Sequence, residues 1–193
     1  AFAGEMLQSH ILHIFFLVVP DLVGAGSIVP LLSSHPVLAK TGLDLKRLAN
    51  EICETIGGRH IHPISLFPGG VVFTPKPQDL KKLKKDLEST FAGLEETLRF
   101  LAGIKLPDFE LEREFISLKA RGEYAFYSGE PVSSVGKEID AKDFTDEVKE
   151  YVVEHSSAKH AATSRGTYMV GALARLNNNS RQLSPKAKAA LKA

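Results

Sequence analysis

The chain has 193 residues, of which 44% are hydrophobic and 24% are charged, as in an ordinary globular protein. Its 24 basic and 23 acidic residues give a net charge of +1, so charge offers no argument for binding nucleic acid or an anionic membrane. The one cysteine, Cys53, excludes an internal disulfide and fits a reducing compartment. From its length we expect 1–193 to fold as a single domain.

The first apolar stretch predicts a helix over residues 4–19. Apolar side chains cover most faces of this helix, which favours a central position, and Pro20 is expected to end it. A membrane span needs about 20 apolar residues, whereas His13, Pro20 and Asp21 interrupt this run. A signal peptide has positive charge before its apolar run, whereas no Lys or Arg precedes this one. We therefore expect a buried core helix and no membrane span. The opening AFAGEM, without an initiator Met, is typical of a processed or excised piece.

Two further helices are predicted from apolar residues at three- and four-residue steps. One covers 45–56, with Asp44 as its N-cap and Gly57 after its last turn, and it follows a predicted loop at 33–42. The other, over 77–103, is the longest predicted helix. Its interspersed lysines and glutamates indicate a solvated face rather than a nucleic-acid patch.

The pattern changes in the second half of the chain. Residues 115–139 carry aromatic and β-branched residues with regularly spaced glycines, which predicts two or three short strands. Residues 140–156 read as a helix or extended arm, and a final helix follows Ser184. The predicted fold is mostly α with a small antiparallel β element: the long helices pack as a bundle, and 115–139 form a β excursion outside it.

A loop rich in glycine and proline, GGRHIHPISLFPGG at 57–70, carries two histidines. Glycine permits a positive φ and proline fixes φ, so a rigid non-helical loop is expected. A second histidine pair, His10 and His13, shares one helix face and could form half of a metal site, with His60 and His62 as the remaining ligands. A core position for His10 and His13 is the simpler interpretation.

Standard catalytic motifs are absent from the sequence. There is no G-x-G-x-x-G, no Walker loop and no G-x-S-x-G, and a cysteine-based zinc site is excluded because Cys53 has no second cysteine to join it. The residues alone therefore indicate a mostly helical domain with a histidine-bearing loop.

Several segments nevertheless resemble, in order, parts of the large (alpha) subunit of nickel-iron hydrogenases, most closely the soluble cytoplasmic multi-subunit type. The matching segments are EMLQSHILHIFFLVVPD at 5–21, GGRHIHPISLFPGG at 57–70, EYAFYSGEPVSSVGKEIDAKDF at 123–144 and SRGTYMVGALARLNNNSRQLSP at 164–185. The resemblance implies a cytoplasmic enzyme that oxidises hydrogen or reduces protons, and a partner small subunit that carries iron–sulfur clusters. Further electron-carrier subunits are implied as possible partners.

The departures from that family limit what this chain can do. The family holds its nickel-iron centre on two C-x-x-C motifs, one before the region resembling Gln8–His13 and one near the C-terminus, and this sequence has neither. Because thiolates hold such a soft metal centre, we expect no cofactor bound to this chain and no catalytic residue in it. Cys53 is interpreted as a core residue, and the chain as a middle segment of a large subunit.

The resemblance also suggests roles for individual residues. Arg59 and His62 match the family's G-R-x-x-H-P loop, which faces the small subunit near an iron–sulfur cluster, whereas His60 lies outside the matched pattern. Gly69 and Gly70, with the loop prolines, would fix the backbone that presents Arg59 and His62. Arg175 and Asn177 are expected to brace their helix against neighbouring carbonyls.

Three alternatives remain open at this point. A cluster-facing, quinone-binding subunit of the respiratory complex I type carries a similar loop and naturally lacks the cysteines. A non-catalytic module that docks an iron–sulfur protein is the second. A metal or haem sensor that uses His10 and His13 is the third.

Overall fold

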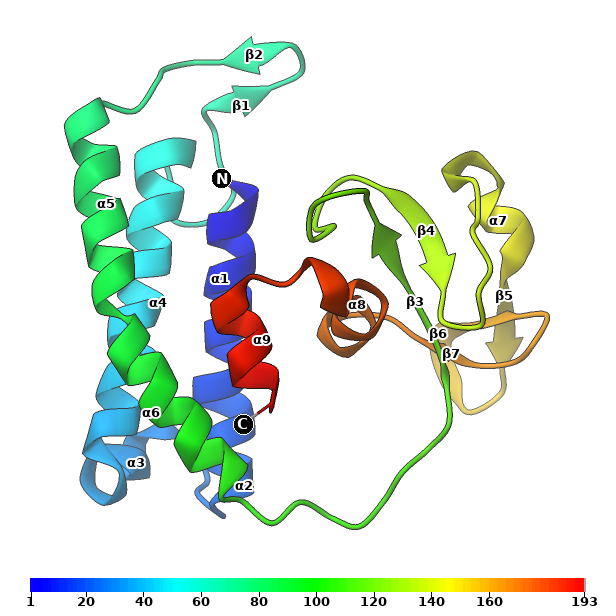
Figure 1. Cartoon of the computed structure of the whole chain (residues 1–193), viewed down its shortest axis with the longest axis horizontal. Helices are drawn as coiled ribbons and strands as arrows, with labels where there is room; N and C mark the ends of the chain where they lie inside the picture. Colours follow the sequence, from blue (N-terminus) through cyan, green and yellow to red (C-terminus); the bar gives the residue numbers. More distant parts are fainter. Residues whose placement is uncertain (193) are drawn as a thin grey trace. The chain divides into compact units, whose positions relative to one another are not determined.

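The computed structural model describes residues 1–192 and divides into two units, Ala1–Lys105 (unit 1) and Leu106–Ala193 (unit 2). Figure 1 shows that unit 1 is built mainly of helices and that the larger sheets belong to unit 2. The mostly helical composition with small sheets is thus confirmed, whereas the single-domain organisation of 1–193 stays a prediction.

The first helical stretch of unit 1 runs past the proline that was expected to end it. It consists of α1 (Phe2–His13), the π-helical turn η1 (Ile14–Val18) and α2 (Val19–Leu22). In the π turn the N–H of Val19 bonds to the carbonyl of Ile14, five residues earlier. This wider turn accommodates Pro20, which lacks an N–H and clashes with the tighter α-helical turn.

The same stretch is apolar on nearly all sides but is buried on one side only. Ile11, Phe15 and Val19 lie in the core, whereas Leu12 and Leu17 are exposed. Among the described residues, Phe2–Leu22 is the one helix whose length and composition would allow it to cross a membrane. One such helix near the start of a chain is weak evidence, because core helices pass the same test.

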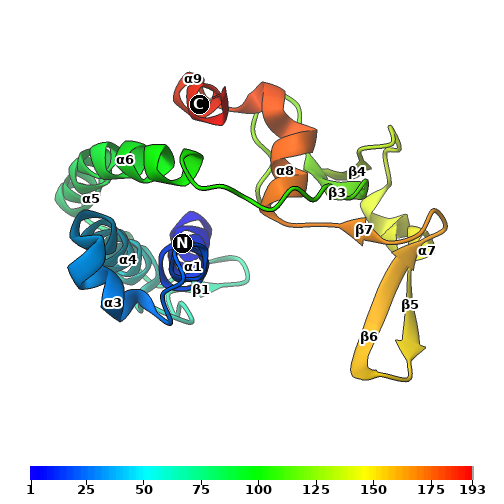
Figure 2. The ribbon, with the colours of Figure 1, turned by 90° about the horizontal axis from the view of Figure 1, so that it is seen from below.

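Helix α4 (Pro36–Gly57) organises unit 1, since α1, α3 (Ile28–Ser34), α5 (Pro77–Ser89) and α6 (Phe91–Ala102) all pack against it. Figure 2 shows α1 and α4 side by side, almost end on. Helix α4 approaches the π turn η1 closely where a Cβ on Gly42 would stand 2.7 Å from Phe15. The buried core consists of Ile11, Phe15, Val19, Leu31, Leu38, Ala39, Leu45 and Ala49.

Two helix boundaries predicted from the sequence are wrong. The predicted loop at 33–42 is mostly helix, because Pro36 occupies the first turn of α4, where its missing N–H costs nothing. The single helix predicted at 77–103 is broken between α5 and α6. There the Ser89 hydroxyl donates to the Asp86 carbonyl and the Thr90 hydroxyl to the Leu87 carbonyl, and such bonds compete with the helical ladder.

Unit 2 contains a three-stranded sheet of order β4-β3-β7, made of β3 (Glu114–Lys119), β4 (Glu130–Ser133) and β7 (Tyr168–Met169). The strands predicted within 115–139 are therefore present. β3 and β4 are antiparallel, as expected for 115–139, whereas the additional strand β7, which was not predicted, runs parallel to β3. The parallel strand comes from a segment about 50 residues further along the chain, which local patterns do not reveal.

The segment predicted as a helix or arm at 140–156 begins with short helical turns, η2 (Ala141–Asp143) and α7 (Phe144–Glu147). It continues as β5 (Val148–Val153), which forms a hairpin with β6 (Ser156–Thr163). Unit 2 ends with α8 (Ala172–Asn179), the turn η3 (Ser180–Gln182) and α9 (Pro185–Lys192).

Helix α8 packs on β3 and is fastened to it by two asparagines. The amide of Asn178 donates to the Phe115 carbonyl at 3.2 Å, and that of Asn179 donates to the Leu118 carbonyl at 2.9 Å. Asn179 is completely buried. These bonds add a donor to β3 carbonyls that also accept from Ser134 and Ser117, and they tie the helix to the strand.

Candidate functional site

The loop that follows α4 is held rigidly against the end of that helix. Gly58 caps α4 with a φ of 79°, and its N–H donates to the Glu54 carbonyl at 2.8 Å. The chain then returns, and the N–H groups of Ile64 and Ser65 both donate to the Gly57 carbonyl, at 2.9 and 3.1 Å. Carbonyls at the helix end are thereby paired by the loop itself. The loop expected from the glycines and prolines is present.

Ser65 fixes the second half of the loop. Its buried hydroxyl donates to the Ile56 carbonyl at 2.8 Å, and its own carbonyl accepts from the N–H of Val72. Between these points lies a hairpin of β1 (Leu66–Phe67) and β2 (Gly70–Val71). Its turn, Pro68–Gly69, has a φ of 90° at the glycine, the conformation that a type II turn requires after proline.

The three polar side chains of the loop have different surroundings. Nε2 of His60 lies 2.7 Å from Oε2 of Glu54, and the His60 carbonyl accepts from the Gln8 amide on α1. Arg59 and His62 are exposed, and within residues 1–192 neither side chain forms a hydrogen bond or ion pair with the protein. His62 has a φ of 56°, a left-handed conformation that costs energy for a residue with a Cβ. The loop therefore presents Arg59 and His62 to solvent.

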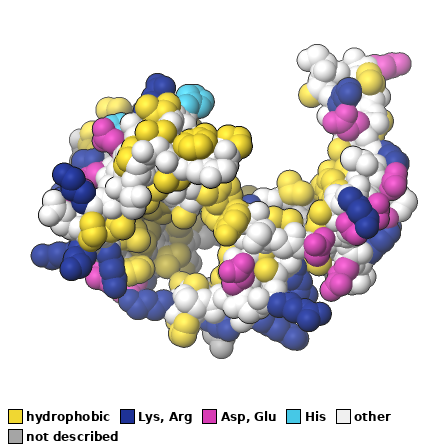
Figure 3. Space-filling model, turned by 90° about the horizontal axis from the view of Figure 1, so that it is seen from above, with side chains coloured by type: hydrophobic (Ala, Val, Ile, Leu, Met, Phe, Trp, Pro, Cys, Tyr) yellow, Lys and Arg dark blue, Asp and Glu magenta, His cyan; other side chains and the backbone are white. Residues whose placement is uncertain are grey.

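Large apolar side chains surround these two residues in the sequence. Seven of them between 61 and 73 are 42–70% exposed: Ile61, Ile64, Leu66, Phe67, Val71, Val72 and Phe73. We call these seven residues, with Arg59 and His62, the loop surface. Figure 3 looks down on the β1–β2 end of unit 1 and shows hydrophobic side chains grouped there beside basic and histidine side chains. Such a dense exposed apolar group is typical of an interaction site.

The residues proposed as metal ligands do not form a metal site. His10 is half-buried and His13 is exposed on α1, and the described residues contain no group of three or more His, Cys, Asp or Glu side chains placed to hold a metal. The structure of the described residues does not bring His10 and His13 together with His60 and His62 in such a group. The reason is that the Gln8 contact brings the backbone of the loop, and not its imidazoles, against α1.

Cys53 does not fit a nickel-iron centre. Its side chain is buried in α4, where a Cβ on Gly4 would stand 3.1 Å from Sγ. Burial, together with the Glu5 carboxylate, raises the pKa of the Cys53 thiol, whereas a metal ligand must be a thiolate. The described residues therefore offer no donor set for that centre.

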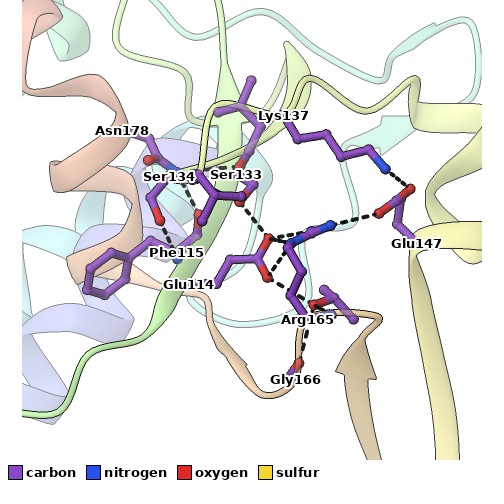
Figure 4. Close-up of polar contacts among 12 residues, drawn as sticks. Glu114, Phe115, Ser133, Ser134, Lys137, Glu147, Arg165, Gly166 and Asn178 are labelled. Carbon is purple, nitrogen blue, oxygen red and sulfur yellow. Dashed lines mark hydrogen bonds and ion pairs between the residues drawn. The ribbon is translucent and has the colours of Figure 1, made fainter.

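A polar cluster in unit 2, shown in Figure 4, was not anticipated from the sequence. The buried Glu114 carboxylate accepts from Ser133 at 2.5 Å and from Thr163 at 2.9 Å, and Nη2 of Arg165 lies 2.5 Å from Oε1. Burial disfavours the charged form of Glu114, but the bonds from Arg165, Ser133 and Thr163 outweigh it and hold its pKa below the ordinary value. Glu114 lies on β3, Ser133 on β4 and Thr163 on β6, so the cluster joins these three strands.

The two residues predicted to brace α8 lie as follows. The guanidinium carbon of Arg175 is 5.3 Å from the ring centroid of Phe126, a cation–π distance. Arg175 also lines an apolar cavity of about 370 Å³ together with Ile116 and Phe144. The Asn177 amide donates to the Leu173 carbonyl within its own helix at 3.0 Å. The bracing role of both residues stays a prediction.

Comparison with known proteins connects these features. No family model matches the chain. The alpha subunit of sulfhydrogenase 1 from Pyrococcus furiosus is 32% identical over 189 residues, which are 97% of this chain and 44% of that protein. The corresponding subunit of the F420-non-reducing hydrogenase vhu from Methanocaldococcus jannaschii is 26% identical over 198 residues.

The chain is homologous to part of the alpha subunits of hydrogenases. The resemblance seen in the sequence is thereby confirmed, and the chain spans a little under half the length of these relatives. An NAD⁺-reducing nickel-iron hydrogenase, crystallised in its H2-reduced state, has the same fold, with a TM-score of 0.86 over 96% of this chain and 47% of that one, at 24% identity. The match covers both units of this alpha-subunit segment.

Proposed function

We propose that this alpha-subunit segment provides the surface on which an iron–sulfur small subunit docks, and that the loop surface is the point of contact. The observation that carries the proposal is the combination of a rigid backbone with seven exposed apolar side chains around two exposed polar ones. Apolar side chains with arginine are typical of the centre of a protein interface.

Arg59 and His62 would then act on the electron acceptor rather than on hydrogen. A guanidinium or imidazole N–H near an iron–sulfur cluster stabilises added negative charge and so raises the reduction potential. That effect requires fixed donors, and the bonds of Ser65 and Gly57 that hold this loop would fix the backbone carrying them.

The complete enzyme would catalyse reversible hydrogen oxidation and proton reduction at a nickel-iron centre, in the cytoplasm, and would pass electrons to further carrier subunits. Because the described residues offer no fitting donors, no step at that centre is assigned to them. The helices around α4 would form the bundle core typical of a nickel-iron large subunit. No observation favours the quinone-binding or sensor alternatives, and a docking role without catalysis is already part of this proposal.

The proposal is tested by measuring the affinity of the 193-residue chain for the iron–sulfur small subunit of Pyrococcus furiosus sulfhydrogenase. Phe67→Ser and Val72→Ser should each weaken binding at least about tenfold, the usual size of a central interface effect. Val29→Ser is the control matched to Val72→Ser, because Val29 is 66% and Val72 70% exposed but Val29 lies on α3, outside the loop surface. Equal affinities for all three variants would overturn the proposal.

A further inference from the structure

The tip of the β5–β6 hairpin carries a cluster of three rings. The ring centroids of His155 and His160 are 5.5 Å apart with an interplanar angle of 83°, and those of Tyr151 and His160 are 5.7 Å apart. His155 occupies the two-residue turn and His160 lies on β6. Figure 2 shows the two strands extending from the rest of unit 2. This cluster lies outside the loop surface and has no role in the proposed docking.

An irregularity in the hairpin creates this cluster. Next to the turn, Val153 of β5 pairs with Ser156 of β6, whereas two residues earlier on β5 Tyr151 pairs with His160. Three residues of β6 therefore face the single residue Val152. In a regular ladder continuing from the first pair, His160 would face Lys149. The bulge therefore moves His160 two residues, or about 7 Å, closer to the turn. Bulges commonly re-aim a side chain in this way.

We propose that His155 and His160 form a two-histidine chelate for a divalent late transition-metal ion, with zinc as the test ion. Metal–nitrogen bonds of about 2 Å at tetrahedral angles place two imidazole centroids roughly 5 Å apart. The observed 5.5 Å needs only a small side-chain adjustment. Imidazole is a ligand that suits zinc, copper and nickel, and copper binds such sites most tightly.

The chelate has two protein ligands, and water completes the coordination. Among residues 1–192 no third His, Cys, Asp or Glu side chain completes a three-ligand group here. Binding is therefore reversible, and the order of affinity is copper above nickel and zinc.

Metal binding has a structural consequence for the hairpin. Most side chains of β5 and β6 are exposed or half-buried, and in the described part of the chain the two strands pair with each other and, at the base, with Gly166 through a single bridge from Thr163. An isolated two-stranded hairpin is marginally stable in water. An ion that links the turn to β6 stabilises the hairpin, because it binds the folded form in preference to the unfolded one.

The test is isothermal titration of the 193-residue chain with zinc chloride. The unmodified chain should bind one ion, and His155→Asn or His160→Asn should weaken binding at least about tenfold, since each removes one of two ligands. The same substitution at His62, an exposed histidine of unit 1, is the control and should leave the affinity unchanged. The proposal would be overturned if either His155→Asn or His160→Asn left the zinc affinity unchanged, or if His62→Asn lowered it by the same factor.

Hydrogen exchange of the unmodified chain gives a second readout that does not depend on folding of the variants. Added zinc should slow exchange of the amides within 150–160 and leave those of α4 unchanged. Equal rates with and without zinc at 150–160 would contradict the chelate.

Discussion

Glu114 and Arg165 lie 51 residues apart in the sequence and form a two-point ion pair in unit 2. Nη2 of Arg165 is 2.5 Å from Oε1 of Glu114, and Nε is 3.1 and 3.2 Å from the two carboxylate oxygens. Arg165 also lies 3.6 Å from Glu147, which pairs with Lys137. One arginine thus connects the start of β3 to the base of the β5–β6 hairpin.

Glu114→Gln should destabilise unit 2 by about 2 kcal/mol at pH 7, because the buried side chain at 114 loses its charge-assisted hydrogen bonds from the exposed Arg165. The folded-state pKa of Glu114 is lowered, so its contribution is present above the unfolded pKa of about 4.3 and is lost as pH falls through the folded value. The difference in stability between parent and variant should therefore shrink below about pH 4.3.

Tyrosine fluorescence during urea unfolding measures this difference, because all four tyrosines lie in unit 2. The comparison runs from pH 7 to pH 3. Both proteins keep some pH dependence from Glu147, whose pKa the Lys137 hydrogen bond lowers. A difference that stays constant over the whole range would show that the ionised form of Glu114 is not the stabilising one.

Removal of the side-chain amide should lower the stability of unit 2 more at Asn179 than at Asn177, although both residues lie on α8. Asn179→Ala should lower the stability of unit 2 by about 1–3 kcal/mol, since the buried Asn179 amide donates to both the Leu118 and the Arg175 carbonyls. Asn177→Ala is the matched control: Asn177 is exposed and bonds only within its own helix, so its effect should stay within about 0.5 kcal/mol. Chemical denaturation of the two variants, followed by the same tyrosine signal, separates them. Equal losses would contradict the fastening role of Asn179.

Sequence periodicity predicted the helices better than their ends. The steps of three and four apolar residues correctly indicated helices around 45–56 and 77–103. The break at Thr90 depends on hydroxyl–carbonyl bonds, and the passage of the first helix through Pro20 depends on a π turn. Neither is encoded in the apolar pattern, which is why both were missed.

The site shows the same division between local and long-range information. The rigid loop followed from its own glycines and prolines, because those residues restrict φ wherever they stand. The Glu114–Arg165 pair and the contact of His155 with His160 depend on strand pairing and on a bulge. Spacing along the chain does not reveal such contacts. For the His155–His160 contact, the one signal in the sequence is the spacing of two histidines five residues apart around a turn.

The left-handed backbone at His62 yields a further prediction. Asparagine tolerates this conformation, so His62→Asn should change stability by less than about 0.5 kcal/mol, whereas a β-branched residue should cost about 1–2 kcal/mol. Thermal unfolding of His62→Asn and His62→Val, followed by far-ultraviolet circular dichroism, gives the comparison. If valine were tolerated as well as asparagine, the loop would not hold its φ of 56° in solution.

Cys53 should be inert in the folded chain. Its thiol is buried and its pKa is raised, so little thiolate is available to react. Labelling with a thiol reagent at pH 8 should be at least about a hundredfold slower than in 6 M urea, because only transient opening exposes the sulfur. Rapid labelling of the native chain would mean that the α1–α4 contact opens readily and would contradict the assignment of Cys53 as a core residue.

Hydrogen exchange of the chain with and without the iron–sulfur small subunit tests the central claim most directly. The docking proposal predicts slower exchange for amides between Arg59 and Phe73 in the complex, because the partner covers the loop surface. It predicts no change at the tip of the β5–β6 hairpin. Unchanged exchange over 59–73 in a complex that demonstrably forms would contradict the assignment of the loop surface as the docking site.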